Sequence, residues 1–164
     1  MTTCFSSPVG LVRITGDEAG VSAITCLNEP DHQPLPTSPL PGPVQLALRQ
    51  LTAYFDGSCQ RFDFPMTPVG TVFQQRVWQA LLTVPFGATV SYLALSRQLG
   101  DEKAIRAVAA ANGRNPLAIV IPCHRIIGSN GSLTGYAGGL WRKQWLLEHE
   151  GALPGAKTGQ MSLF

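Results

Sequence analysis

The sequence has no paired-cysteine motif and no long apolar run. None of its four cysteines lies in a CxxC pair, so neither a disulfide framework nor a zinc knuckle is indicated. Cys4, Cys26, His32 and Cys59 are too irregularly spaced for a zinc site, and HExxH is absent, so we expect no metal. No basic leader precedes an apolar stretch and no run is long enough to cross a bilayer, which predicts a cytoplasmic protein.

Acidic residues are scarce in the second half of the chain. Residues 1–70 carry three Lys/Arg against six Asp/Glu, whereas residues 71–164 carry nine against four. A basic half is typical of nucleic-acid contact, although a solvated basic face has the same composition. The change in charge falls at the Pro/Gly-rich stretch 62–70, where we expect a domain boundary. The expected division is an N-terminal domain over 1–62, a linker over 63–70, a second domain over 71–151 and a flexible tail over 152–164.

The first third of the chain predicts a small antiparallel sheet with one helix. Residues 11–15 and 21–27 are β-branched runs separated by a turn-rich segment. Six prolines between positions 30 and 43 exclude a helix or a central strand there. From Val44 the apolar spacing becomes helical, and Gly57 is placed to end that helix.

The remainder is mostly helical, so the predicted fold class is α+β. Residues 71–84 repeat apolar side chains at helical spacing, and 89–115 predict two helices about a turn at Gly100, resembling a helix-turn-helix. The second of these helices is rich in alanine, and Arg106 is its only long charged side chain before Asn112. Such a helix can pack closely against a core, or it can enter a DNA groove with Arg106 projecting. The sequence leaves both interpretations open.

Cys123 directly precedes His124 in the segment IVIPCHRIIG. The β-branched run before it predicts a buried strand that turns at the thiol. A buried cysteine is ordinarily inert, but the neighbouring His124 and Arg125 favour the thiolate. Adjacent residues of an extended chain point in opposite directions, so the cysteine and histidine need a turn or a bridging water between them. Glu150, at the end of the last helix, is the candidate to orient the histidine, although a solvated helix-end glutamate fits its spacing equally well.

These segments, together with the Gly-rich stretch 131–139 around Tyr136, resemble the O(6)-methylguanine-DNA methyltransferase family, also called methylated-DNA-protein-cysteine methyltransferase. The resemblance covers residues 71–151 and depends most on PCHR. It implies a ribonuclease H-like N-terminal domain and a winged-helix-like second domain. It also implies DNA repair by direct reversal: one irreversible transfer of the methyl group of O6-methylguanine in duplex DNA to Cys123, without turnover or cofactor. O4-methylthymine is a second candidate substrate.

The resemblance also implies a role for each residue that matches a family motif. Cys123 is the methyl acceptor, His124 activates it through water, and Glu150 holds this histidine. Asn115 supports the link between the recognition helix and the active-site turn, and Tyr92 lies beside N3 of the extruded guanine. The residues expected at the DNA are Ser91, Arg106, Ala107, Ala110, Asn112 and Arg114, of which Arg106 fills the vacated stack.

Tyr92 also belongs to the expected substrate pocket, with Ile126, Tyr136, Ala137 and Gly138. The backbone carbonyls of Cys123 and Ile126 resemble the family's acceptors for the exocyclic amine. Family members carry serine where this chain has Ala137, so only a backbone N–H is left to reach the base's O6.

Two other functions share parts of this pattern. A non-catalytic protein that binds alkylated DNA would use the same helices but lacks the reactive cysteine, and a Cys-His-Glu hydrolase would need an oxyanion hole. The C-terminal QMSLF resembles the pentapeptide that binds the bacterial sliding clamp, with Gln160, Leu163 and Phe164 as anchors. The expected partners are alkylated duplex DNA and the clamp. We expect a nucleoid-associated monomer, with cooperative binding on DNA as an additional property.

Overall fold

A computed structural model describes residues 1–28 and 38–153. It divides the chain into two compact units, one formed by residues 1–69 with 116–118 and the other by residues 70–115 and those from 119 onward. Residues 116–118, which the sequence analysis assigned to the second domain, thus belong to the first unit. The tail residues Gln160, Leu163 and Phe164 lie outside the described part of the chain.

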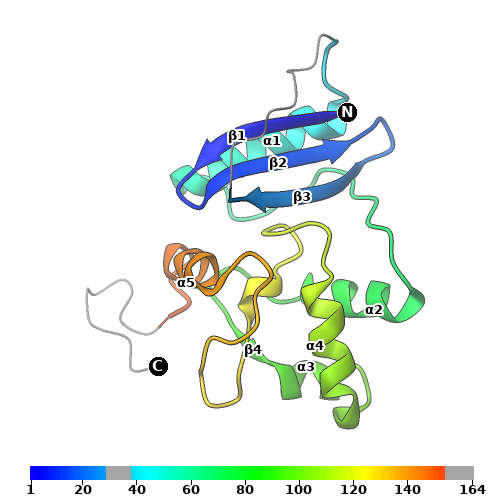
Figure 1. Ribbon diagram of the computed structural model, residues 1–164, viewed down its shortest axis with the longest axis vertical. Coiled ribbons are helices and arrows are strands. Elements are labelled where there is room, and N and C mark those ends of the chain that lie inside the picture. The colour runs from blue at the N-terminus through cyan, green and yellow to red at the C-terminus, as the bar shows by residue number, and fades with distance from the viewer. Residues whose placement is uncertain (29–37, 154–164) are drawn as a thin grey trace. The chain divides into compact units, whose positions relative to one another are not determined.

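The first unit is a three-stranded antiparallel sheet with a helix along one face (Figure 1). Val12 and Ile14 of the middle strand are fully buried, as expected where alternate side chains face a covering layer. Val44 and Leu51 of the helix are also fully buried. Gly57 ends the helix at φ 89°, a conformation that glycine adopts without a Cβ penalty. The elements, with the strands paired in chain order, are β1 (Thr2–Ser7), β2 (Gly10–Gly16), β3 (Val21–Leu27) and α1 (Gly42–Asp56).

The outer edge of β3 is paired by two short segments from elsewhere in the chain. Val21 N donates to Pro65 O at 2.9 Å, and Thr67 N donates to Val21 O at 2.8 Å. Further along the strand, Ile24 N donates to Pro116 O at 2.9 Å. These bonds satisfy an edge that would otherwise expose unpaired backbone groups. The stretch 63–70, expected as a linker, is therefore hydrogen-bonded to β3 at Pro65 and Thr67.

The second unit is mostly helical and contains the expected pair of helices around Gly100. Thr71 and Gln74 form a reciprocal capping box at the start of its first helix. The indole N–H of Trp78 donates to Ala111 O at 2.9 Å in the interior, which joins this helix to the alanine-rich one. The elements are α2 (Val72–Leu81), β4 (Val90–Ser91), α3 (Tyr92–Gln98), η1 (Glu102–Ala104), α4 (Ile105–Gly113), η2 (Cys123–Arg125), β5 (Ile126–Ile127) and α5 (Leu140–His149), with β4 parallel to β5.

The α+β class is confirmed, with two differences in detail. The strand β1 is present although the sequence analysis did not identify it; it pairs along its whole length with β2. The buried strand expected before Cys123 is absent, because residues 118–120 form a turn and Ile121 a bend instead. Ile119 lies in these turns at φ 74°, a conformation that no strand contains. Burial on all sides explains the apolar run without a sheet, since Ile119, Val120 and Ile121 are at most 5% exposed. No helix in the described residues is long and apolar enough to cross a membrane.

Candidate functional site

Cys123 begins a single 3-10 turn that follows Pro122. The turn is closed by a bond from Arg125 N to Pro122 O at 3.0 Å. Because a 3-10 helix has three residues per turn, consecutive side chains diverge by about 120° rather than by the opposite directions of a strand. The turn that the sequence analysis required between Cys123 and His124 is thus present. Only 7% of Cys123 is exposed.

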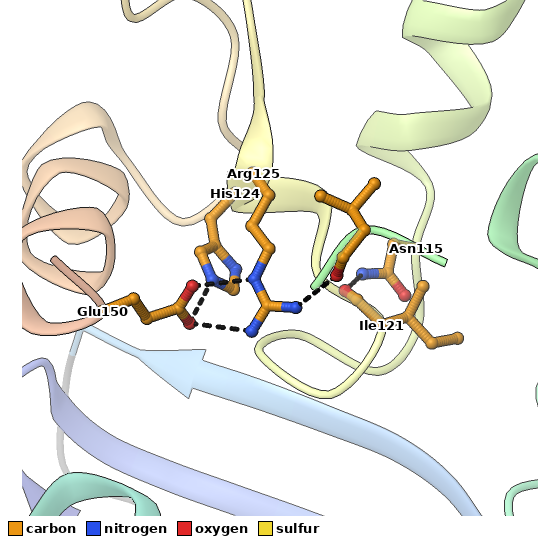
Figure 2. A network of polar contacts seen from close by, with 6 residues as sticks. Asn115, Ile121, His124, Arg125 and Glu150 are labelled. Carbon is orange, nitrogen blue, oxygen red and sulfur yellow. Dashed lines mark hydrogen bonds and ion pairs between the residues drawn. The ribbon is translucent and has the colours of Figure 1, made fainter. Parts of the chain in front are cut away.

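Glu150, the residue that caps the end of α5, reaches the same turn. Its carboxylate lies 2.8 Å from His124 Nε2 and 2.7 Å from Arg125 Nε. A second guanidinium nitrogen, Arg125 Nη2, bonds to Glu150 Oε2 at 3.1 Å, and Nη1 donates to Val84 O at 2.7 Å. Figure 2 shows the imidazole and the guanidinium side by side in front of this carboxylate. The solvated position for Glu150 is excluded, because its side chain is fully buried.

His124 is held in one orientation with one ring nitrogen unused. Its side chain is fully buried, and Nδ1 has no hydrogen-bond partner among the described residues. Burial lowers the pKa of His124, and the charges of Arg125 and Lys143 lower it further, although Glu150 opposes both. The imidazole is therefore neutral near pH 7. With Nε2–H donating to the carboxylate, Nδ1 carries the lone pair and can accept a proton.

The carboxylate of Glu150 stays ionised despite its burial. Desolvation alone would raise its pKa, but the hydrogen bonds from His124 and Arg125 and the charge of Arg125 outweigh that effect and hold the pKa at about 2. The bidentate guanidinium supplies the compensating charge that a buried carboxylate needs. Glu150 is thus a fixed anion that orients the imidazole.

The thiol of Cys123 is surrounded by groups that favour its charged form. Burial raises the pKa of Cys123 above its ordinary value, and hydrogen bonds from Asn115 and Tyr136 and the charge of Lys143 offset only part of that rise. Lys143 is itself fully buried, and its ammonium donates to Ile126 O at 2.5 Å and to Thr134 O at 2.9 Å. Burial lowers the Lys143 pKa to about 8, so the ammonium remains mostly charged at neutral pH. The site therefore has a base, a cation and two hydrogen-bond donors around one sulfur.

Asn115 and Tyr92 connect this sulfur to the helix-turn-helix and to the Gly-rich loop. Asn115 Nδ2 donates to Ile121 O at 2.7 Å, which fixes the segment before the turn (Figure 2). The Tyr92 hydroxyl donates to Thr134 O at 3.1 Å. Burial and the nearby Cys123 charge raise the pKa of Tyr92, so its hydroxyl stays protonated. Asn115 and Tyr92 thus both lie near the reactive turn.

Of the other residues expected in the pocket, Tyr136, Ala137 and Gly138 lie on the loop after β5. Ile126 is the first residue of β5. Tyr136 contacts the thiol as described, Ala137 is exposed, and Gly138 is half-buried. A Cβ on Gly138 would come within 2.8 Å of the Tyr136 ring, so glycine is required for this close approach. Ile126 is fully buried, and its carbonyl already accepts the Lys143 ammonium.

Three of the six residues expected at the DNA lie on the outer face of α4. Arg106, Ala107 and Ala110 are exposed there, and Arg114 is exposed just after the helix ends. Two of the expected residues have other positions. Ser91 is the N-cap of α3, with its hydroxyl accepting from Ala94 N at 3.0 Å. Asn112 is only 3% exposed and faces inward, so it does not belong to the outer surface of the helix.

Sequence reasoning did not identify Lys143 as part of the site, nor the ion pair of Arg125 with Glu150. A signal for both was present. Lys143 and Glu150 lie seven positions apart on the side of α5 that carries the buried Leu146 and Leu147. Charged residues on an apolar helix face are buried, and buried charges need partners. In the described residues no three His, Cys, Asp or Glu side chains gather to hold a metal ion.

Comparisons with known proteins show which family this chain resembles. Residues 72–152 match the family described as "6-O-methylguanine DNA methyltransferase, DNA binding domain". The methylated-DNA-protein-cysteine methyltransferase of Methanosarcina acetivorans is 44% identical over 150 residues, which cover 90% of this chain and 96% of that protein. The Mycobacterium bovis protein of the same name is 47% identical over 88% of each chain.

Solved structures of similarly named proteins align with almost the whole chain. The O6-methylguanine methyltransferase of Mycobacterium tuberculosis aligns with a TM-score of 0.79 and 43% identity, covering 93% of this chain and 94% of the other. The OGT of that organism in complex with DNA aligns with a TM-score of 0.80 and 45% identity, covering 91% and 92%. These relatives show, in agreement with the Cys123–His124–Glu150 arrangement and the helix-turn-helix, that the chain belongs to the methylated-DNA-protein-cysteine methyltransferase family of DNA-repair enzymes.

Proposed function

We propose that this chain repairs O6-methylguanine in duplex DNA by moving the methyl group irreversibly to its own Cys123, once per molecule. The observation that carries the proposal is a neutral, fully buried His124 fixed by Glu150 beside a cysteine under the charge of Lys143. The family's printed names and the DNA complex of the M. tuberculosis relative support alkylated DNA as the substrate.

The methylated base must first leave the helix, because a thiolate cannot approach O6-methyl in line inside a base stack. Flipping costs a few kcal/mol, and least for a poorly paired base. The exposed face of α4 suits this step. Alanines leave it narrow enough to approach a groove, and the exposed Arg106 can occupy the gap left by the base.

The transfer then needs only the chain's own residues. His124 Nδ1 takes the Cys123 proton through a water molecule, and the thiolate attacks the methyl carbon. The carbon–O6 bond breaks as the carbon–sulfur bond forms, and the electron pair stays on the purine. The Tyr92 hydroxyl is a donor for that developing charge. A thioether is a poor leaving group, so nothing in the site regenerates the thiol.

A titration tests the proposal directly. Excess duplex with one O6-methylguanine is incubated with the protein, repaired base is counted, and peptides are mapped by mass spectrometry. We expect repair to stop at one equivalent with a permanent methyl on the peptide containing Cys123. Cys123→Ser should abolish transfer and keep DNA binding, whereas Cys59→Ser, in the first unit, should repair one equivalent like wild type. Continued turnover would contradict the proposal, a transient acyl adduct would indicate a hydrolase, and binding without an adduct would indicate a non-catalytic reader.

We propose O4-methylthymine as a weaker substrate and the replication sliding clamp as a second partner of a monomeric protein. The clamp proposal depends on the sequence QMSLF, in which Gln160, Leu163 and Phe164 would be the anchors. Deleting residues 160–164 should abolish clamp pull-down and leave methyl transfer on free duplexes unchanged. Equal recovery of clamp with and without these residues would exclude it.

A further inference from the structure

Arg142, in the first turn of α5, is a buried cation that the reaction scheme above does not use. Only 2% of the residue is exposed. Burying a guanidinium costs free energy unless its charge and its N–H groups find partners. Nη1 donates to Gly138 O at 2.8 Å, and the guanidinium carbon lies 4.6 Å from the centre of the Trp141 ring. The guanidinium is thus held by a carbonyl of the Gly-rich loop and by an aromatic face.

The loop that Arg142 contacts has no regular structure of its own. Residues 128–139 form neither helix nor strand. Gly135 and Gly139 have positive φ values of 63° and 96°, and glycine leaves a backbone free to adopt many conformations. Because ordering such a backbone costs entropy at every residue, the loop keeps one conformation only where contacts from outside hold it.

Two consecutive side chains of α5 hold this loop on either side of Tyr136. Lys143 Nζ donates to Thr134 O at 2.9 Å, two residues before the tyrosine. The bond from Arg142 to Gly138 O lies two residues after it. A Cβ on Gly138 would come within 2.8 Å of the Tyr136 ring, so the backbone of Gly138 lies against that ring. A displacement of Gly138 therefore displaces the ring.

Tyr136 is the residue of this loop that acts on the nucleophile. Its hydrogen bond lowers the pKa of Cys123, against the larger opposing effect of burial. Such a bond depends steeply on distance and alignment, so it requires a fixed ring. Lys143 lowers the pKa of the same thiol directly, through its charge. Arg142, bonded to the carbonyl of Gly138, affects the thiol by holding the loop.

We infer that Arg142 is a positioning residue for methyl transfer, which holds the Gly138 carbonyl and thereby keeps the Tyr136 hydroxyl against the thiol of Cys123. The inference rests on the proposed function, because methyl transfer is the reaction that the thiol performs. Trp141 contributes from the outer side. Its side chain is exposed, yet its ring lies against the guanidinium, which shields the bond to Gly138 O from water and so strengthens it.

The test measures the pH dependence of Cys123 in two ways. Single-turnover rate constants for methyl transfer are measured against pH with saturating O6-methylguanine duplex. The rate at which iodoacetamide alkylates Cys123, followed by mass spectrometry of the peptide that contains it, gives a second profile without DNA.

The variants separate the charge of Arg142 from its action through Tyr136. They are Arg142→Met, Tyr136→Phe, the two changes together, and Arg142→Lys. Arg142→Gln is the second variant in case methionine disturbs the fold. Arg49→Met is the matched control, because it removes an exposed arginine from α1 in the first unit. Thermal melting establishes that each variant is folded.

We expect both profiles of Arg142→Met to move to higher pH by about one unit, the effect of one hydrogen bond to a thiolate. Tyr136→Phe should give the same shift, and the double variant no more than either change alone, because both remove the same bond. Arg142→Lys keeps a donor for the Gly138 carbonyl and should shift the profiles less. Arg49→Met should match wild type.

Two results would overturn the inference. Unmoved profiles for Arg142→Met would show that the arginine only supports the fold, and shifts that add in the double variant would show that it acts without Tyr136. A wild type that transfers no methyl at any pH would instead refute the proposed function, and the iodoacetamide profiles would still decide whether Arg142 acts on the thiol through Tyr136.

Discussion

Replacing Glu150 by glutamine tests the electrostatic arrangement on which the site depends. The change keeps the shape of the side chain and removes its charge. Arg125, whose side chain is only 8% exposed, would then keep Val84 O but lose its anion. Breaking a buried ion pair from one side costs about 3–5 kcal/mol. We therefore expect Glu150→Gln to lower the free energy of unfolding by about that amount at pH 7.

The pKa of Glu150 gives a second estimate and a pH signature. The pKa falls from 4.5 to about 2 on folding, and each unit corresponds to about 1.4 kcal/mol, which gives about 3 kcal/mol. A carboxyl with a depressed folded pKa stabilises the fold above its unfolded pKa, and this stabilisation is lost as the pH falls through the folded value. The difference between wild type and Glu150→Gln should thus be largest above pH 4.5 and shrink toward pH 2.

Urea unfolding of both proteins at several pH values measures this difference. Glu148→Gln is the matched control, since this exposed carboxylate of the same helix bonds only to Gln144 in the described structure, at 2.9 Å. Its loss should change stability by less than about 0.5 kcal/mol. The reasoning would be refuted by a Glu150→Gln protein as stable as wild type at pH 7, or by a difference that does not vary with pH.

Three further outcomes follow from the same geometry. Lys143→Met should raise the pKa of Cys123 and slow methyl transfer at pH 7 by about tenfold for each unit by which that pKa rises. Its pH–rate profile should therefore move to higher pH, and an unmoved profile would exclude a role for the ammonium. Wild type should lose stability below pH 6.5 faster than His124→Gln, because the His124 pKa is lowered on folding and the unfolded chain binds the extra proton; parallel curves would contradict a neutral buried imidazole. Trp78→Phe should cost about 1 kcal/mol by removing the indole bond to Ala111 O, which keeps only its bond from Arg114 N at 3.2 Å. Repair should stay equimolar, and a melt matching wild type would show that the indole bond contributes nothing.

Local signals in the sequence were sufficient for most elements of the fold. Gly57 ends α1 as expected, because a left-handed residue closes a helix and glycine adopts that conformation freely. The strand expected before Cys123 failed for an equally physical reason. An apolar β-branched run reports burial and not conformation, and Ile119 to Ile121 are buried as turns. The pairing of residues 116–118 with β3 also escaped prediction, since nothing local marks a contact between segments about ninety residues apart.

The site was predictable to the extent that its residues lie in one short motif or at a helix end. Cys123 and His124 are adjacent, and Glu150 was selected from only four carboxylates in its half of the chain. The inward direction of Asn112 was not predictable in the same way. In an alanine-rich helix nearly every face looks equally small, so the sequence does not show which face is buried. Tertiary packing determines which face of the helix is buried. Here α4 packs against Trp78, whose indole N–H bonds to Ala111 O.

The arrangement of charge explains why one helix carries both Lys143 and Glu150. A carboxylate near a thiol would normally raise the thiol pKa and oppose thiolate formation. Here Arg125 binds both oxygens of Glu150. The carboxylate still hydrogen-bonds directly to His124, but the guanidinium cancels its electrostatic effect on more distant groups. Lys143, bonded only to neutral carbonyls at Ile126 and Thr134 in the described structure, has no such compensation. Its charge therefore lowers the pKa of Cys123 against the larger opposing effect of burial. The same helix can thus supply an anion to the base and a cation to the nucleophile without the two cancelling.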